Sequence, residues 1–248
     1  MRDSYRDELN ATTELIVTVA GLVRTAVQDA TTALVTADLT IAERVISGDA
    51  RIDELTKEIE QRSFQLLARQ APVAGELRTV VAVLRMSYSL DRMGDLAAHI
   101  AKIARLRYPE VAAPEPVADQ IKQMAETADS MIATAITTLE NRDAEAAAGL
   151  ATADSKMDEL RSDQFHLLLG DDWEYGVEKA VDTALLGRYY ERIADHADRR
   201  ESHGRGGDDR RQQQAEHRIE RPRRDRHAGG VVDEGEEQVL PDVRHRLT

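Results

Sequence analysis

The chain has 248 residues, of which 42% are hydrophobic but only 4% aromatic, and it contains only 6 prolines. Alanine and straight-chain residues lose little rotamer freedom in a helix, so this composition predicts an all-α fold rather than a sandwich or barrel. The absence of cysteine excludes disulfides, thiolate metal sites and a cysteine nucleophile. A formal net charge of −13 argues against nucleic-acid binding, because it repels phosphates, and favours a metal ion or a basic partner surface.

Three helices are expected in the first half of the chain. Apolar residues spaced mostly by threes and fours form one amphipathic seam from Leu9 to Leu34 and a second from Ile41 to Leu66. Pro72 ends the second helix, because proline disfavours helix in the residue before it and suits the first turn of the next helix. A third long helix is expected over residues 73–107.

The same plan recurs after a proline-rich break. Helices are expected near residues 117–141, near 143–169 and from about Trp173 onward. Three helices, a break and three more helices indicate an internal duplication with pseudo-two-fold repeats. The sequence therefore predicts a first three-helix bundle over residues 1–108 and a linker over residues 109–116. A second three-helix bundle, with a truncated last helix, is predicted over residues 117–197.

Residues 198–248 have a different composition, with 12 Arg, no Lys and no aromatic residue. No helical or alternating period continues beyond Ala197. One interpretation is a disordered tail, because such a segment buries too little apolar surface to offset its ordering entropy. The change is abrupt and falls within a helical pattern, which favours a second interpretation, an out-of-frame stretch of a GC-rich gene. The other reading frames of the DNA would distinguish the two.

The sequence carries no sign of export or membrane insertion. The first ten residues hold five charged side chains, unlike a signal peptide. The longest uncharged apolar stretch, residues 15–23, is much shorter than the roughly 20 residues that span a bilayer. We therefore expect a cytoplasmic protein without direct membrane insertion.

A pair of acidic residues occurs at matching places in the two halves. Asp91-Arg-Met-Gly-Asp95 matches Glu191-Arg-Ile-Ala-Asp195. Residues four apart share a helix face, where like charges repel by roughly a few tenths of a kcal/mol unless a cation lies between them. Paired carboxylates suit Mg²⁺, Mn²⁺, Fe or Ca²⁺, and zinc with less preference. The alternative is a solvated polar face with neighbouring basic side chains, because the helical wheel places Asp91 and Asp95 away from the apolar centre of their helix.

Other motifs give weaker signals. Asp163-Gln-Phe-His166 has the acid-x-x-His spacing of di-iron bundles, but such sites need that spacing on two helices together with further inward carboxylates. His99 and His196 are expected to be surface residues. A run of small residues in the third helix predicts a close helix contact at Gly94, Ala97, Ala98 and Ala101.

Three stretches together resemble the PhoU family: Leu66 to Arg78, Asp91 to Lys102, and Arg188 to Ala197. The resemblance covers about residues 1–197 and is closest to actinobacterial members. It implies two three-helix bundles side by side. In the family the last helix continues as an apolar stretch beyond Ala197, so here the second bundle is expected to lose apolar contacts worth about 1.5–3 kcal/mol for each buried side chain.

The resemblance also implies a function. It implies a negative regulator of high-affinity phosphate uptake and of the phosphate-starvation two-component signal, without catalytic residues. The implied partners are the ATPase subunit of the phosphate ABC transporter, a sensor histidine kinase and a second copy of the chain. Metal ions (Fe, Zn, Mn or Mg) are implied at Asp91, Asp95, Glu191 and Asp195, with Asp53 and Asp154 as additional ligands.

Two alternative functions of other classes are an enzyme and a metal-free scaffold. The first is a metal-dependent enzyme of the di-iron type on a helical bundle, which the single acid-x-x-His motif and the outward position of the acids argue against. The second is a metal-free helical scaffold, which elemental analysis of the purified protein would distinguish from the metal-binding regulator.

Overall fold

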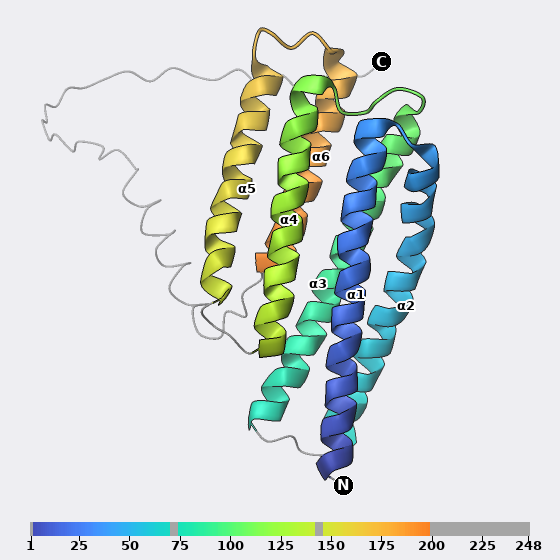
Figure 1. Ribbon diagram of the computed structural model, residues 1–248, viewed down its shortest axis with the longest axis vertical. Coiled ribbons are helices and arrows are strands. Elements are labelled where there is room, and N and C mark those ends of the chain that lie inside the picture. The colour runs from blue at the N-terminus through green and yellow to red at the C-terminus, as the bar shows by residue number, and fades with distance from the viewer. Residues whose placement is uncertain (1, 70–73, 142–145, 199–248) are drawn as a thin grey trace, which may run out of the picture. The chain divides into compact units, whose positions relative to one another are not determined.

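The structure is a computed structural model that describes residues 2–69, 74–141 and 146–198. These residues form six helices and no strand, which confirms the predicted all-α fold (Figure 1). The predicted tail from residue 198 lies outside the described residues, apart from Asp198 itself, which ends the last helix. The helices are α1 (Arg2–Thr36), α2 (Leu39–Arg69), α3 (Ala74–Arg107), α4 (Glu115–Asn141), α5 (Ala146–Leu169) and α6 (Gly176–Asp198).

The start of α1 lies before its predicted seam. α1 begins at Arg2 rather than near Leu9, and its first turns are held by a small apolar cluster. In this cluster Tyr5 and Leu9 of α1 are buried together with Leu66 of α2 and Val80 of α3. The sequence pattern alone did not indicate this cluster, because Tyr5 stands among five charged residues.

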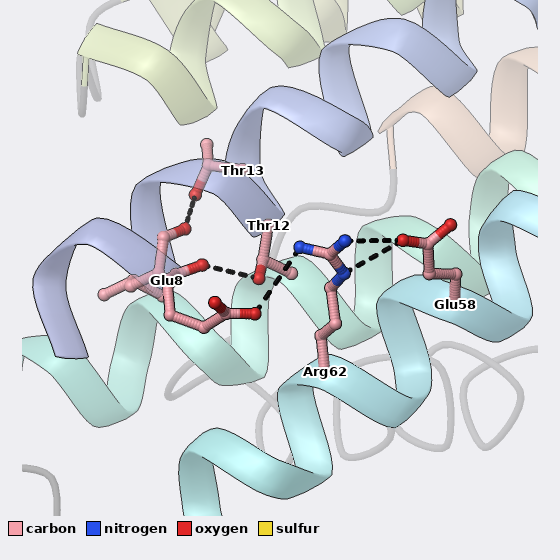
Figure 2. A network of polar contacts seen from close by, with 6 residues as sticks. Glu8, Thr12, Thr13, Glu58 and Arg62 are labelled. Atoms are coloured by element: carbon pink, nitrogen blue, oxygen red, sulfur yellow. Dashed lines mark hydrogen bonds and ion pairs between the residues drawn. The ribbon is translucent and has the colours of Figure 1, made fainter. Parts of the chain in front are cut away.

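Polar contacts also join this end of α1 to α2 (Figure 2). The Arg62 guanidinium donates to one carboxylate oxygen of Glu58 at 3.0 and 2.6 Å, and to Glu8 of α1 at 3.4 Å. Thr12 is buried and its hydroxyl donates back to the Glu8 carbonyl oxygen at 2.7 Å. Arg62 therefore connects the two helices near the N-terminus of α1.

The helix ends follow local sequence signals. Asp38 caps α2, because its Oδ1 accepts a hydrogen bond of 3.0 Å from the Ile41 amide. Pro116 stands in the first turn of α4, where a missing amide hydrogen has no cost, instead of in the predicted linker. α6 begins later than predicted, at Gly176, because Trp173 belongs to the preceding turn and its indole donates to the Gly176 carbonyl oxygen at 2.9 Å.

The six helices share one apolar core. α1, α2 and α3 contact one another, as do α4, α5 and α6, and further contacts join α1 to α4 and α3 to α6. Two hydrogen bonds of 2.8 Å join Arg24 of α1 to Asp129 of α4. In the core, the Thr31 and Tyr190 hydroxyls of α1 and α6 lie 2.7 Å apart. Because the buried apolar residues of all six helices form a continuous cluster, the division into two bundles at residues 109–116 stays a prediction.

A close approach of α5 and α6 fixes how these helices pack. A Cβ atom at Gly187 would lie 1.9 Å from Oε1 of Gln164, which is fully buried. In the first half, Ser63 corresponds to Gln164 and Ser87 corresponds to Gly187. The larger glutamine on α5 is therefore matched by the smaller glycine on α6.

Gly187→Ala is therefore expected to destabilise the protein by about 1–3 kcal/mol, because Gln164 has no solvent to move into. Gln164→Ser in the same chain should recover part of the loss. Urea unfolding of the two single variants and the double variant measures the coupling between the sites. Equal losses with and without Gln164→Ser would show that the contact does not determine the packing.

Candidate functional site

The first acidic couplet, Asp91 and Asp95, lies on the side of α3 that faces α2. Asp91 accepts a hydrogen bond of 3.0 Å from the Thr56 hydroxyl of α2. Between the two acids, a Cβ atom at Gly94 would meet Ile52 and Asp49 of α2 at 3.1–3.2 Å, so the helices approach closely here. This confirms the predicted helix contact at Gly94. It also corrects the expected outward position of Asp91, whose side chain is only 24% exposed, whereas that of Asp95 is 37% exposed.

Two further acids of α2 extend this couplet. The Oδ1 atom of Asp49 is buried and has no hydrogen-bond partner within the part of the chain that the structure describes. Burial raises the pKa of Asp49, and the charges of Asp95, Asp53 and Asp91 raise it further, while Lys102 opposes them. Asp53, which the PhoU resemblance suggested as an additional ligand, thus lies within electrostatic reach of the couplet. We name Asp49, Asp53, Asp91 and Asp95 the first acidic cluster.

The charge of the first acidic cluster is partly balanced by basic side chains. Arg92 donates to Asp95 at 2.7 Å and lies 3.7 Å from Asp91, while Lys57 lies 3.9 Å from Asp53. In these side-chain positions, the described residues contain no group of three acids or histidines arranged to hold a metal ion. The donor chemistry nevertheless fits a hard cation, because the buried Asp49 Oδ1 has no hydrogen-bond partner within the described residues.

The second couplet, on α6, has a different environment. Glu191 accepts a hydrogen bond of 3.1 Å from Arg161 of α5 and another from Arg188 of α6. The Arg161 side chain is only 15% exposed, so this cation is built into the α5–α6 contact. Burial raises the pKa of Asp195, and the charges of Glu191 and Asp158 raise it further. In the second couplet the facing helix α5 thus supplies an arginine, which neutralises Glu191. In the first couplet the facing helix α2 supplies only the uncharged hydroxyl of Thr56.

The raised pKa values of Asp49, Asp91 and Asp195 predict a pH dependence of stability. In each case burial is the first cause, so the charged carboxylate is disfavoured in the folded state. A folded protein that holds more protons than the unfolded chain becomes less stable as pH rises. The penalty is complete above the raised folded pKa and disappears as pH falls toward the ordinary carboxyl pKa of about 4.

This predicts that, with a chelator present, Asp49→Asn makes the free energy of unfolding fall less steeply with rising pH than in the unaltered chain. Chemical denaturation of the two proteins between about pH 4 and pH 7.5 measures the difference in slope. Parallel curves would mean that Asp49 does not titrate differently in the folded state.

The other candidate residues do not assemble into a site. Asp163 and His166 are both exposed on α5, so the inward di-iron arrangement is not present among the described helices. His99 is exposed as expected, and its ring stacks on Tyr189 at 5.6 Å. The expected surface position of His196 is wrong, because its side chain is buried. α6 packs against α3 as well as α4 and α5, which covers more of its circumference than one amphipathic seam predicts.

Comparison with known proteins agrees with this architecture. The sequence model of the PhoU domain matches residues 16–104 and 121–199. The chain belongs to the PhoU family. Phosphate-specific transport system accessory protein PhoU homolog 2 of Mycobacterium tuberculosis is 43% identical over 197 residues, which cover 79% of this chain and 92% of the relative. PhoU homolog 1 of Mycobacterium leprae is 42% identical over 197 residues, covering 79% and 89% respectively.

Solved PhoU structures have the same fold. The crystal structure of PhoU from Pseudomonas aeruginosa matches with a TM-score of 0.73 at 26% identity, covering 78% of this chain and 93% of that one. The phosphate transport system regulatory protein PhoU from Streptococcus pneumoniae matches with a TM-score of 0.71 at 26% identity, covering 78% and 91%. Because PhoU proteins are accessory regulators, membership of the family confirms that this chain is not an enzyme and supports a regulatory role in phosphate transport.

The PhoU helices described here contain no segment long and apolar enough to cross a membrane. The sequence analysis did not identify three residues near the acidic couplets: Asp49, Asp158 and Arg161. Asp49 stands four residues before Asp53, and Asp158 four residues after Asp154. The spacing that identified the couplets on α3 and α6 was therefore also present on α2 and α5.

Proposed function

We propose that this chain is a cytoplasmic negative regulator of high-affinity phosphate uptake and of the phosphate-starvation two-component signal. The observation that carries the proposal is the 43% identity over 197 residues with a protein named as an accessory of the phosphate-specific transport system. Relatives named as accessory proteins of the phosphate transport system support action through protein contacts rather than turnover.

The proposed contacts are with the ATPase subunit of the phosphate transporter, a sensor histidine kinase and a second copy of the chain. A regulator of this kind works by differential affinity: it must bind one state of its partner more tightly than the other to shift the equilibrium between them. The formal net charge of −13 is one that a basic partner surface would complement.

A divalent cation at the acidic couplets is the second part of the proposal. Asp91 and Asp95 would hold it in the first half, with Asp49 and Asp53 of α2 as additional ligands. The buried Asp49 oxygen without a partner and the raised pKa values of Asp49 and Asp91 support a cation at this place. Bound there, the cation would neutralise the carboxylates and join α2 to α3.

The second couplet, Glu191 and Asp195, stays a predicted metal site, with Asp154 as its additional ligand. Arg161 and Arg188 already pair with Glu191, so a cation there has to displace one of them. This observation favours a metal-free scaffold for the second half, and the metal content of the purified protein would distinguish one loaded couplet from two or none.

Co-purification tests the regulatory proposal. The tagged chain is isolated from cells grown at high and at low phosphate, and the transporter ATPase subunit and the sensor kinase are quantified by immunoblot. We expect both partners at high phosphate and less of at least one at low phosphate. Absence of both partners from the high-phosphate sample would contradict the proposal.

A further inference from the structure

A group of exposed apolar side chains lies where α5 ends and α6 begins. On α6, Val177 is 80% exposed, and Val181 and Leu185 follow at intervals of four residues, which places them on one face of the helix. On α5, Leu169 is 83% exposed and Phe165 lies one turn before it. α5 and α6 contact each other, and Figure 1 shows the short loop that joins them at this end. We name these five residues, with Tyr175 of the loop, the α5–α6 apolar patch.

The two rows of side chains belong to one surface. The contact of Gly187 with Gln164, and a hydrogen bond of 3.2 Å from Arg161 to the Ala184 carbonyl oxygen, set the register of the antiparallel helices. This register places Phe165 and Leu169 alongside the exposed row of α6. Arg161 covers one face of the Phe165 ring at 4.3 Å and holds that side chain in place.

Acidic residues lie at the loop end of the patch. Asp171, Asp172 and Glu174 of the α5–α6 loop are exposed and make no ion pair within the described residues. Glu178, the residue after Val177, is 74% exposed on its side chain although it pairs with Arg107. An apolar surface with exposed acidic side chains at its loop end is complementary to a helix with one apolar face and basic residues beside it.

We propose that the α5–α6 apolar patch is the docking surface for a basic amphipathic helix of a partner protein. A second copy of this chain fits the surface less well than a basic partner, because each copy carries a formal net charge of −13. The patch occupies the first turns of α6, whereas Glu191 and Asp195 lie on its last turns, so this docking does not require metal at the couplets.

A synthetic helix tests the proposal on the full chain. The probe is an 18-residue peptide with leucines at helical spacing and lysines elsewhere, and its control has the same composition in scrambled order. Binding is followed by anisotropy of the labelled peptide and by emission of Trp173, the single tryptophan, whose ring lies 5.2 Å from that of Tyr175. We expect the amphipathic peptide to bind, more weakly as salt rises, and the scrambled peptide to bind at least tenfold more weakly.

Two triple variants locate the contact. Val177→Ser with Val181→Ser and Leu185→Ser leaves the net charge unchanged and is expected to weaken binding roughly tenfold or more. The control replaces Leu22, Leu39 and Leu77, exposed leucines on α1, α2 and α3, by serine, and it should retain binding. Failure of the unaltered chain to bind, or equal losses in the two triple variants, would overturn the proposal. Self-association that the α6 variant abolishes would identify a second copy as the occupant and would also overturn it.

Discussion

Replacing Asp91 and Asp95 together by asparagine is expected to abolish stabilisation of the protein by a divalent cation. If Mn²⁺ or another cation binds the first acidic cluster, a concentration one hundred times the dissociation constant stabilises the unaltered chain by about 2.7 kcal/mol. The variant should show no such gain. Without metal the variant should be as stable as the unaltered chain or slightly more stable, because the two negative charges that repel the Asp49 carboxylate are removed. Urea unfolding with chelator and with added Mn²⁺ measures both effects.

The second couplet provides the matched control. Glu191→Gln with Asp195→Asn changes two acids in the same motif, but Arg161 and Arg188 lose a partner and the variant should be less stable without metal. It should still be stabilised by the cation through the first acidic cluster. If both double variants respond to Mn²⁺ as the unaltered chain does, neither couplet binds the cation.

Tyr190→Ala is expected to have the largest effect on stability, a loss of about 3–5 kcal/mol. Tyr190 is fully buried on α6 within the shared core, so alanine would leave a cavity. Its hydroxyl also lies 2.7 Å from Thr31 of α1, and the change would leave that polar group with one partner fewer. The shift of the urea midpoint, with the m-value checked for constancy, measures the loss.

Two further variants separate packing from hydrogen bonding at this site. Tyr190→Phe keeps the ring and should cost only about 1 kcal/mol. Tyr189→Ala removes a half-buried ring that stacks on His99 and should cost less than Tyr190→Ala. A small effect of Tyr190→Ala, comparable with that of Tyr189→Ala, would contradict a continuous core shared by α1 and α6.

The fold could be predicted from the sequence because its helices carry strong local signals. The seams from Leu9 to Leu34 and from Ile41 to Leu66 lie within α1 and α2, and Pro72 follows the end of α2. The burial of His196 could not be predicted in the same way. A helical wheel gives the apolar face of a helix but not how many neighbours it has, and α6 contacts three other helices.

The candidate site could be predicted only in part. The repeated couplets were visible because the same spacing recurs on α3 and α6, and the structure places Asp91 and Asp95 beside Asp49 and Asp53 of α2. The different surroundings of the two couplets could not be predicted from the sequence. It depends on Arg161 of α5 reaching Glu191 across a helix contact, which a pattern within single helices cannot reveal.

Phosphate uptake in cells measures the proposed regulation itself. The chromosomal copy of the gene is deleted, and labelled phosphate uptake is measured at high external phosphate with no plasmid, with the unaltered chain, and with the Asp91→Asn, Asp95→Asn chain. We predict high uptake in the deletion strain, low uptake restored by the unaltered chain, and a smaller reduction of uptake by the variant. Unchanged uptake in the deletion strain would contradict a regulatory role in phosphate transport.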